Sequence, residues 1–245
     1  MALKSIVYDG CSYDISYEVI NPASKKDIAI LHGWGSNKEL MRGSFETTLT
    51  DFRHIYIDMP GFGGSSNESI LHTSDYAAII KLFLEAVKFR GEVILGHSFG
   101  GKVATLLNPK LLVLVASSGI LVPKSLSVKV KITLFKFFKL IGLERFRSVF
   151  VAADAATLSP GMYETFKNVV NEDFTESFAT FKGKALLCFG DADTATPLYT
   201  AYEIQKLMNN ARVVEFDGDH YFFMNAPNNL HVNDEILKSL KEMEN

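Results

Sequence analysis

A serine flanked by glycines marks a tight turn in the first half of the chain. Ser98 stands between Gly96 and Gly100, at the end of a predicted strand and the start of a predicted helix. In a turn this tight, side chains at the two glycine positions would collide with the strand or the helix, and the serine hydroxyl is pushed out of the sheet. The N–H of Phe99, at the positive end of the helix, is aimed toward the same point. The pattern indicates a nucleophile elbow.

A serine hydroxyl is a poor nucleophile at neutral pH, so it needs a base that a third group orients. Two later loops offer these partners in the order serine, acid, histidine. Asp191 and Asp193 follow the apolar run at residues 185–189, and His220 follows residues 212–216. We expect His220 to be the base. Both aspartates are candidates for the acid, although Asp191 also suits a loop role in which it binds backbone amides.

Strands and helices must hold these loops together at one edge of a sheet. Short apolar runs that alternate with helical patterns predict an α/β fold, with a mostly parallel sheet and helices on both faces. The predicted strands are residues 28–31, 55–57, 93–95, 111–116, 185–189 and 212–216, and the predicted helices are residues 38–50, 76–90 and 229–243, with another after Ser98. The Asp9-Gly10 turn between residues 3–8 and 12–20 predicts an opening hairpin. The glycine-rich loops lie at the carboxyl ends of strands, where such sheets gather function.

The character of the chain changes after Gly119. Residues 124–147 hold seven basic residues against one acidic residue, with phenylalanines interleaved. We predict that residues 123–182 form a helical insertion, and that residues 1–122 and 183–245 together form one core. The basic excess fits the solvated face of amphipathic helices, and it also fits a docking surface for an anionic partner.

The composition is that of a globular protein. The chain has 245 residues, of which 47% are hydrophobic and 22% charged, so a sizeable core can be buried. The formal net charge of −3 argues against a nucleic-acid-binding protein. Cys11 and Cys188 lie far apart, so we expect no disulfide and a reducing compartment. The chain shows no secretory signal pattern and no apolar run near the ~18 residues of a membrane span. We therefore expect a cytoplasmic protein with no transmembrane segment.

Five stretches of the chain resemble the motifs of one superfamily. The HGxG oxyanion loop is matched by His32-Gly33-Trp34-Gly35, and the D-x-P-G-x-G-x-S turn by residues 58–65. The G-H-S-x-G-G elbow is matched by residues 96–101. The G-x-x-D-x-x-x-P acid loop is matched by residues 190–197, and the terminal histidine loop by Gly218-Asp219-His220. By these motifs the chain resembles the α/β-hydrolase superfamily, in its lid-bearing branch of serine esterases and carbon–carbon bond hydrolases. The resemblance covers nearly the whole chain, and the motifs come in the family's order.

The resemblance implies a catalytic triad of Ser98, Asp193 and His220. It places the acid at Asp193. Asp219 adjoins His220, but an adjacent carboxylate rarely points at the imidazole. Some family members carry the acid after the strand that precedes the lid, and residues 117–119 hold no carboxylate there.

The resemblance also implies an oxyanion hole and a cover. The backbone N–H groups of Trp34 and Phe99 would hold the oxyanion. The ring of Trp34 either lines the acyl pocket or packs in the core at the edge of the sheet. Residues 123–182 would form a lid over Ser98, with an apolar side that lines a pocket for an apolar acyl or aryl group.

The implied function is a serine hydrolase that cleaves an acyl bond, foremost a carboxylic ester, through an acyl-enzyme and without a cofactor. One alternative is a methyl ester or thioester on an acyl-carrier protein, because residues 32–35 and the basic lid also resemble biotin-pathway esterases that demethylate a pimeloyl carrier-protein ester. Carbon–carbon bond hydrolysis and a ligand-binding receptor on the same fold are the others. A serine at position 98 argues against dehalogenase or epoxide hydrolase chemistry, which uses a carboxylate nucleophile in this family.

The remaining histidines are given structural roles. We expect His97 to pack or to hydrogen bond beside the nucleophile, and His32 to shape the oxyanion loop. His54, His72 and His231 are expected on the surface or in loops. The chain has no H-x-x-E-H motif and no Cys/His cluster, so we expect no metal site.

Overall fold

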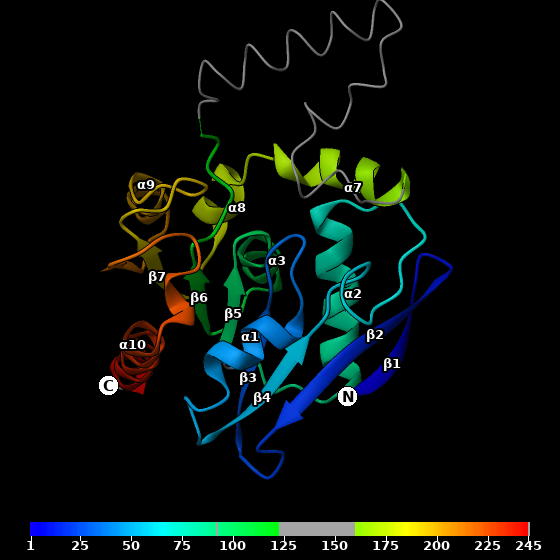
Figure 1. The fold of residues 1–245 in the computed structure, drawn as a ribbon, viewed down its shortest axis with the longest axis horizontal. Coiled ribbons are helices and arrows are strands. Elements are labelled where there is room, and N and C mark those ends of the chain that lie inside the picture. The colour runs from blue at the N-terminus through cyan, green and yellow to red at the C-terminus, as the bar shows by residue number, and fades with distance from the viewer. Residues whose placement is uncertain (92, 123–159, 245) are drawn as a thin grey trace, which may run out of the picture.

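An eight-stranded sheet forms the centre of the protein (Figure 1). The computed structural model describes residues 1–91, 93–122 and 160–244. The strands are β1 (Ala2–Tyr8), β2 (Cys11–Ile20), β3 (Lys26–Leu31), β4 (Phe52–Ile57), β5 (Val93–His97), β6 (Leu111–Val115), β7 (Lys184–Gly190) and β8 (Ala211–Phe216), in the order β1-β2-β4-β3-β5-β6-β7-β8. β2 is antiparallel to both β1 and β4, and all other neighbours are parallel. The predicted mostly parallel sheet is confirmed.

The opening hairpin is also confirmed. Tyr8 pairs with Cys11, so Asp9 and Gly10 form a two-residue turn. Both turn residues have positive φ, 48° and 74° respectively. A two-residue turn of this kind needs positive φ at both positions, and Asp-Gly supplies it at low cost.

Alternation along the strands sends side chains into two apolar layers. On β3, Ile28 and Ile30 join one layer, and Ala29 and Leu31 join the other. The first layer is completed by α1 (Lys38–Phe45) and α10 (Ala226–Glu244). The second is completed by α2 (Thr73–Ala86), α3 (Phe99–Leu107), α8 (Thr175–Thr180) and α9 (Tyr199–Leu207). The predicted cover of helices on both faces is therefore confirmed.

The structure corrects one residue assignment and several boundaries. His54, expected on the surface, is fully buried on β4, where its Nδ1 lies 2.8 Å from the Tyr56 hydroxyl and its Nε2 lies 2.9 Å from the Leu49 carbonyl. Both ring nitrogens are thereby satisfied, which removes most of the cost of burial. The helix predicted at residues 76–90 begins and ends earlier, as α2, and α9 was not predicted.

Most of the predicted insertion lies outside the described residues. Of residues 123–182, the structure describes α7 (Pro160–Val170), α8 and their flanking residues. The Phe174 N–H donates to the Gly119 carbonyl (2.9 Å), which ties the end of the insertion to the chain that enters it. The boundaries at 123 and 182 stay a prediction, and the basic segment at residues 124–147 is not described.

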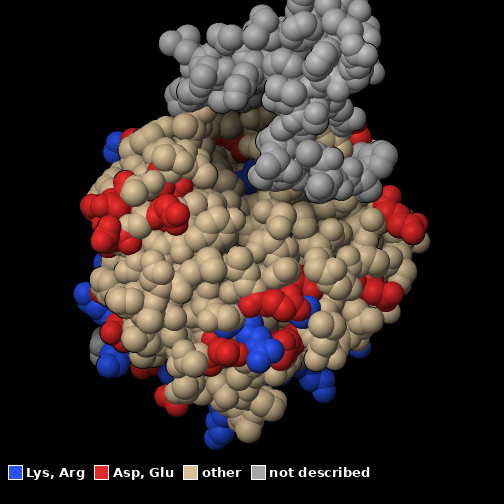
Figure 2. All heavy atoms as spheres, viewed as in Figure 1, with Lys and Arg blue, Asp and Glu red and all other residues tan. Residues whose placement is uncertain are grey.

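On the face that Figure 2 shows, charged side chains lie in small groups. On the face in Figure 2, acidic and basic groups adjoin over α1, where Arg42 pairs with Glu18 and Glu46. Much of the rest of this face is uncharged (Figure 2). No helix within residues 1–91, 93–122 and 160–244 has the length and apolar character that a bilayer span requires.

Candidate active site

The predicted site residues lie on loops at one edge of the sheet. β5 ends directly before Ser98, β7 ends at Gly190 before Asp193, and β8 ends at Phe216 before His220. Because these strands are parallel, their carboxyl ends share an edge. Figure 1 shows α7 and α8 beyond the edge at which β5 and β6 end.

Ser98 occupies a strained backbone position between β5 and α3. Its φ of 51° and ψ of −115° are rare for a residue with a side chain. A Cβ on Gly96 would lie 2.3 Å from the Gly100 carbonyl oxygen, and a Cβ on Gly100 would lie 2.5 Å from the His32 carbonyl oxygen. Only glycine fits at either position. Ser98 makes no capping hydrogen bond to α3, so its hydroxyl is not used by the helix.

The structure brings Asp193 and His220 together. His220 Nδ1 lies 2.7 Å from Asp193 Oδ2, and Asp193 is buried. Asp193 Oδ1 accepts the N–H groups of Ala195 (2.7 Å) and Thr196 (2.9 Å). The Thr196 hydroxyl donates to Asp193 Oδ2 (2.7 Å). Burial raises the pKa of Asp193, but the hydrogen bonds from His220 and Thr196 outweigh it and leave the pKa below its ordinary value. The carboxylate is therefore ionised and accepts the His220 Nδ1–H.

The two competing aspartates have other partners. Asp191 Oδ1 accepts the Gly218 N–H (3.0 Å), which is the loop role expected for it and which ties the acid loop to the histidine loop. Asp219 Oδ1 accepts the N–H of Tyr221 (2.8 Å). Among the described residues, no group of three or more His, Cys, Asp or Glu could hold a metal ion. The expectation that the site needs no metal stays a prediction.

His97 connects three parts of the site. Its Nε2–H donates to the His220 backbone carbonyl (3.1 Å), and its ring lies 4.7 Å from the His220 ring. Its Nδ1 would lie 2.9 Å from a Cβ on Gly33, and the same Cβ would lie 3.2 Å from Ser98 Cβ. Burial, with His220 nearby, lowers the pKa of His97 to about 3. His97 is therefore neutral, and it fills the space between the nucleophile, the base loop and residues 32–35, which we call the oxyanion loop.

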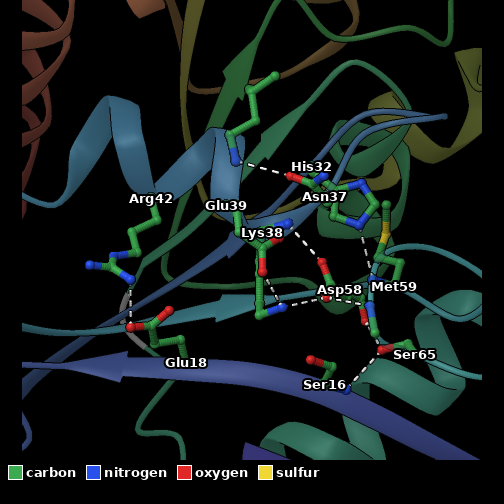
Figure 3. A network of polar contacts seen from close by, with 12 residues as sticks. Ser16, Glu18, His32, Asn37, Lys38, Glu39, Arg42, Asp58, Met59 and Ser65 are labelled. Atoms are coloured by element: carbon green, nitrogen blue, oxygen red, sulfur yellow. Dashed lines mark hydrogen bonds and ion pairs between the residues drawn. The ribbon is translucent and has the colours of Figure 1, made fainter. Parts of the chain in front are cut away.

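The orientation of one peptide in the oxyanion loop follows from His32. The Met59 N–H donates to His32 Nε2 (3.0 Å; Figure 3), so the proton of the neutral ring is on Nδ1. This Nδ1–H donates to the Gly33 carbonyl (2.7 Å). The C=O and N–H of a trans peptide point in opposite directions. A fixed Gly33 carbonyl therefore fixes the Trp34 N–H as well. The structure gives His32 the loop-shaping role expected from the sequence.

The second fixed point of the oxyanion loop is a buried ion pair. Lys38 Nζ lies 2.6 Å from Asp58 Oδ2, with the side chains 1% and 0% exposed (Figure 3). The backbone N–H of Lys38 donates to Asp58 Oδ1 (2.7 Å), and that of Gly64 donates to Oδ2 (2.9 Å). Burial lowers the pKa of Lys38, but the hydrogen bonds with Asp58 and Glu39 outweigh burial and raise it. Asp58 thus joins the start of α1 to the loop after β4.

The Phe99 N–H is the other expected donor. Phe99 is the first residue of α3, and the first N–H groups of a helix have no partner within it. Among the described residues, the backbone hydrogen bonds of turns and loops use neither this N–H nor that of Trp34. Both donors are thus available at the edge that carries Ser98.

Comparison with known proteins decides the family. The profile described as the alpha/beta hydrolase family matches residues 28–230. The chain belongs to the α/β-hydrolase family. The α/β-hydrolase fold that the resemblance implied is confirmed.

The matches to individual proteins are either short or low in sequence identity. A pimeloyl-[acyl-carrier protein] methyl ester esterase from Vibrio campbellii (strain ATCC BAA-1116) is 38% identical over 79 residues, 32% of this chain and only 30% of the relative. An esterase from Exiguobacterium antarcticum has a TM-score of 0.72 at 20% identity, covering 94% of this chain and 96% of the other. A meta-cleavage product hydrolase from Pseudomonas fluorescens IP01 has a TM-score of 0.70 at 18% identity, covering 98% of each chain. At such identities, the two solved structures show a shared fold alone.

In this member of the family, Trp34 lies in an aromatic cluster. Its ring centroid is 4.8 Å from that of Phe62, 5.5 Å from that of Phe99 and 5.3 Å from that of Phe166. These four residues are the aromatic cluster. Phe166 comes from α7, so the cluster joins the insertion to both expected oxyanion donors.

Sequence reasoning missed several buried residues near the candidate site. Thr196, which binds both oxygens of Asp193, stands directly before Pro197, and its place in the acid loop was the only signal. Lys38 and Lys102 look like solvent-facing lysines at the start of helices, and nothing in the local sequence shows that both are buried.

We predict that Gly96→Ala destabilises the protein. The new Cβ would meet the Gly100 carbonyl oxygen at 2.3 Å, so the free energy of unfolding should fall by about 2–3 kcal/mol. Gly43→Ala is the control, because no atom lies within 4 Å of a Cβ there and alanine is the better helix former. Urea unfolding should show Gly43→Ala unchanged or more stable. Equal losses for both variants would contradict the clash.

We predict that His97 makes stability depend on pH. The pKa of His97 is about 3 in the folded protein and ordinarily about 6.5. Between these values the unfolded chain binds more protons, so this contribution to stability is lost as pH falls from about 6.5 toward 3. His97→Gln removes it, so the variant's free energy of unfolding should change less between pH 7 and pH 5.

The control for this prediction is the exposed His231. His231→Gln should keep the wild-type dependence of the unfolding free energy on pH. Urea unfolding at both pH values gives the comparison. An identical pH dependence in His97→Gln and the wild type would contradict the buried neutral imidazole.

Proposed function

We propose that this chain is a serine hydrolase that cleaves carboxylic esters through Ser98, His220 and Asp193. The observation that carries the proposal is the 2.7 Å hydrogen bond between His220 and the buried, ionised Asp193, on loops that share the sheet edge of Ser98. The strained turn at Ser98 supports it, because such strain persists at sites where a side chain must be presented. Membership of the α/β-hydrolase family supports the same chemistry.

The proposed reaction proceeds in two halves. Because His220 Nδ1–H donates to Asp193, its Nε2 is free to take the Ser98 proton as Ser98 Oγ attacks the ester carbonyl carbon. The carbonyl π electrons move to oxygen, which the N–H groups of Trp34 and Phe99 hold. One such donor typically stabilises the transition state by about 3–4 kcal/mol. The alkoxide then leaves with the proton from His220, and the acyl group stays on Ser98.

The second half regenerates the enzyme. His220 takes a proton from water, and the hydroxide attacks the acyl carbon of the Ser98 ester. The second tetrahedral species collapses, the acid leaves, and His220 returns its proton to Ser98 Oγ. Asp193 keeps its charge throughout, and its hydrogen bonds from Thr196 and Ala195 hold it in place beside the imidazole.

The aromatic cluster supports an apolar acyl group as substrate. The Trp34 ring packs against Phe62, Phe99 and Phe166, beside the backbone groups that would hold the oxyanion. We propose that residues 123–182 form the lid over this site, of which α7 supplies Phe166. The lid and the aromatic cluster would together line a pocket for an aliphatic or aryl acyl group.

A carrier-linked methyl ester is a second candidate. The specific observation in its favour is the 38% identity over 79 residues to an esterase whose substrate is named as a pimeloyl-[acyl-carrier protein] methyl ester. That match covers 30% of the relative, so the substrate does not transfer with the family. The seven basic residues at 124–147 would be the docking surface for the acidic carrier. Carbon–carbon hydrolysis and a receptor without activity are the remaining alternatives.

We predict that Ser98→Ala abolishes hydrolysis of p-nitrophenyl esters. With the nucleophile gone, kcat/KM should fall at least about a thousandfold for esters from acetate to decanoate. A fluorophosphonate probe should label the wild type at Ser98 and leave the variant unlabelled. Activity that survives in Ser98→Ala would refute the proposal, and a wild type that neither reacts with the probe nor cleaves any ester would favour the receptor.

We predict a separate result if the carrier-linked ester is the substrate. Reversing charge at Lys129, Lys131 and Lys136 should lower kcat/KM for a methyl ester on an acyl-carrier protein by about tenfold or more, and leave p-nitrophenyl acetate unchanged. The same reversal at Lys81, Lys88 and Lys110, distant along the sequence, is the control. Equal losses on both substrates, or none on the carrier ester, would exclude docking through this segment.

A further inference from the structure

A buried lysine on the helix behind Ser98 has no part in the proposed reaction. Lys102 follows Ser98 by one turn of α3 and is 2% exposed. Lysines are almost never fully buried unless their charge is paired. The partners of Lys102 therefore show what its charge is used for.

The Lys102 ammonium binds the end of α7. Its Nζ donates to the Val169 carbonyl (2.6 Å), in the last turn of α7, and lies 3.3 Å from Glu172 Oε2. A cation at a helix C-terminus is favourable because the free carbonyls carry partial negative charge. The same ammonium lies 5.0 Å from the centre of the Phe174 ring, within the range of a cation–π contact.

Glu172 extends this contact to a third helix. The Thr73 hydroxyl, at the start of α2, donates to Glu172 Oε2, the oxygen that faces Lys102. The contact therefore joins α2, α3 and the end of α7. Two more bonds hold α7 to the chain before α2, because the Leu71 N–H donates to Thr165 Oγ1 (3.0 Å) and the Asn168 side chain donates to the Leu71 carbonyl (3.4 Å).

Burying the charge of Lys102 has a free-energy cost. Burial lowers the pKa of Lys102, and the attraction to Glu172 does not outweigh it. Buried ion pairs are often no better for stability than apolar side chains of similar volume. Their advantage is that they fix the relative position of their partners. A hydrogen-bonded charge is satisfied in one geometry, whereas an apolar contact is satisfied in many. The Lys102 contact thus defines where α7 lies.

The position of α7 matters because of Phe166. This residue lies one turn before Val169, and its ring centroid is 5.3 Å from that of Trp34. Trp34 in turn contacts Phe99, which follows Ser98 directly. A shift of α7 would move Phe166 off Trp34 and change the shape of the apolar region next to the proposed nucleophile.

We propose that Lys102 is a positioning residue that sets acyl-chain selectivity by holding α7, so that Phe166 forms a wall of the subsite for apolar acyl groups. The proposal rests on the proposed esterase function and deepens it. It assigns long or aryl acyl esters as the substrates that need this wall. Short acyl esters, which do not reach it, are cleaved without it.

The first measurement is selectivity. In Lys102→Met, the ratio of kcat/KM for p-nitrophenyl octanoate to that for p-nitrophenyl acetate should fall about fivefold to tenfold, with acetate hydrolysis unchanged. Phe166→Ala should lower the same ratio. The double variant should lower it no further, because the two substitutions remove the same wall. Lys167→Met is the matched control, since Lys167 lies on α7 but is half exposed. It should keep the wild-type ratio.

The second measurement does not need activity. Trp34 is the only tryptophan, so its fluorescence reports the contact with Phe166. Emission should shift to longer wavelength in Lys102→Met and Phe166→Ala and stay unchanged in Lys167→Met. If Lys102→Met fails to fold, Glu172→Gln weakens the same contact and should shift both the emission and the selectivity in the same direction.

The outcomes separate this inference from the proposed function. An unshifted emission, an unchanged ratio, or equal losses on both esters in a folded Lys102→Met variant would overturn the positioning role. A wild type that cleaves neither ester would overturn the proposed function and the selectivity that rests on it. The Trp34 emission would then still decide whether Lys102 holds α7.

Discussion

The site depends on a carboxylate that is buried beneath it. Asp58 is fully buried, and its carboxylate accepts three hydrogen bonds, two from Lys38 and one from the Gly64 N–H. A Cβ on Gly63 would lie 2.3 Å from this carboxylate, so the chain wraps it closely at a residue with φ of 52°. Removing the Lys38 charge would leave the buried Asp58 carboxylate without its ion-pair partner. The pair therefore fixes where α1 begins and where the loop after β4 turns, and the oxyanion loop lies between these points.

The strained backbone of Ser98 is also held by fixed neighbours, here through hydrogen bonds with residues at the end of the neighbouring strand. The Ser98 N–H donates to the Val115 carbonyl (3.1 Å), and the Ser118 N–H donates to the Ser98 carbonyl (3.2 Å). A strained conformation costs of order 1–3 kcal/mol and persists only when its surroundings over-determine it. Here the end of β6 and the close approach of Gly100 to the His32 carbonyl supply that constraint.

Sequence reasoning succeeded where a signal is local and failed where a contact is long-range. The continuous apolar run from Ile28 to Leu31 was enough to predict a buried strand, and the alternation of such runs with helical patterns predicted helices on both of its faces. The pairing of Asp193 with His220 follows the order of motifs along the chain, which the family resemblance supplied. His54 and Lys102 were beyond reach, because their burial depends on partners such as the Leu49 and Val169 carbonyls, which only the folded chain brings near.

In the proposed reaction, turnover and selectivity use different atoms of Trp34 and Phe99. The proposed oxyanion donors are the backbone N–H groups of Trp34 and Phe99, which His32 and the start of α3 orient. The side chains of these two residues instead pack against each other, and the Trp34 ring also packs against Phe62 and Phe166. Since a substitution at either position keeps the N–H, the aromatic cluster is free to vary with the acyl group while the oxyanion site stays in place. Holding the donors through backbone geometry therefore allows one fold to accept different acyl chains.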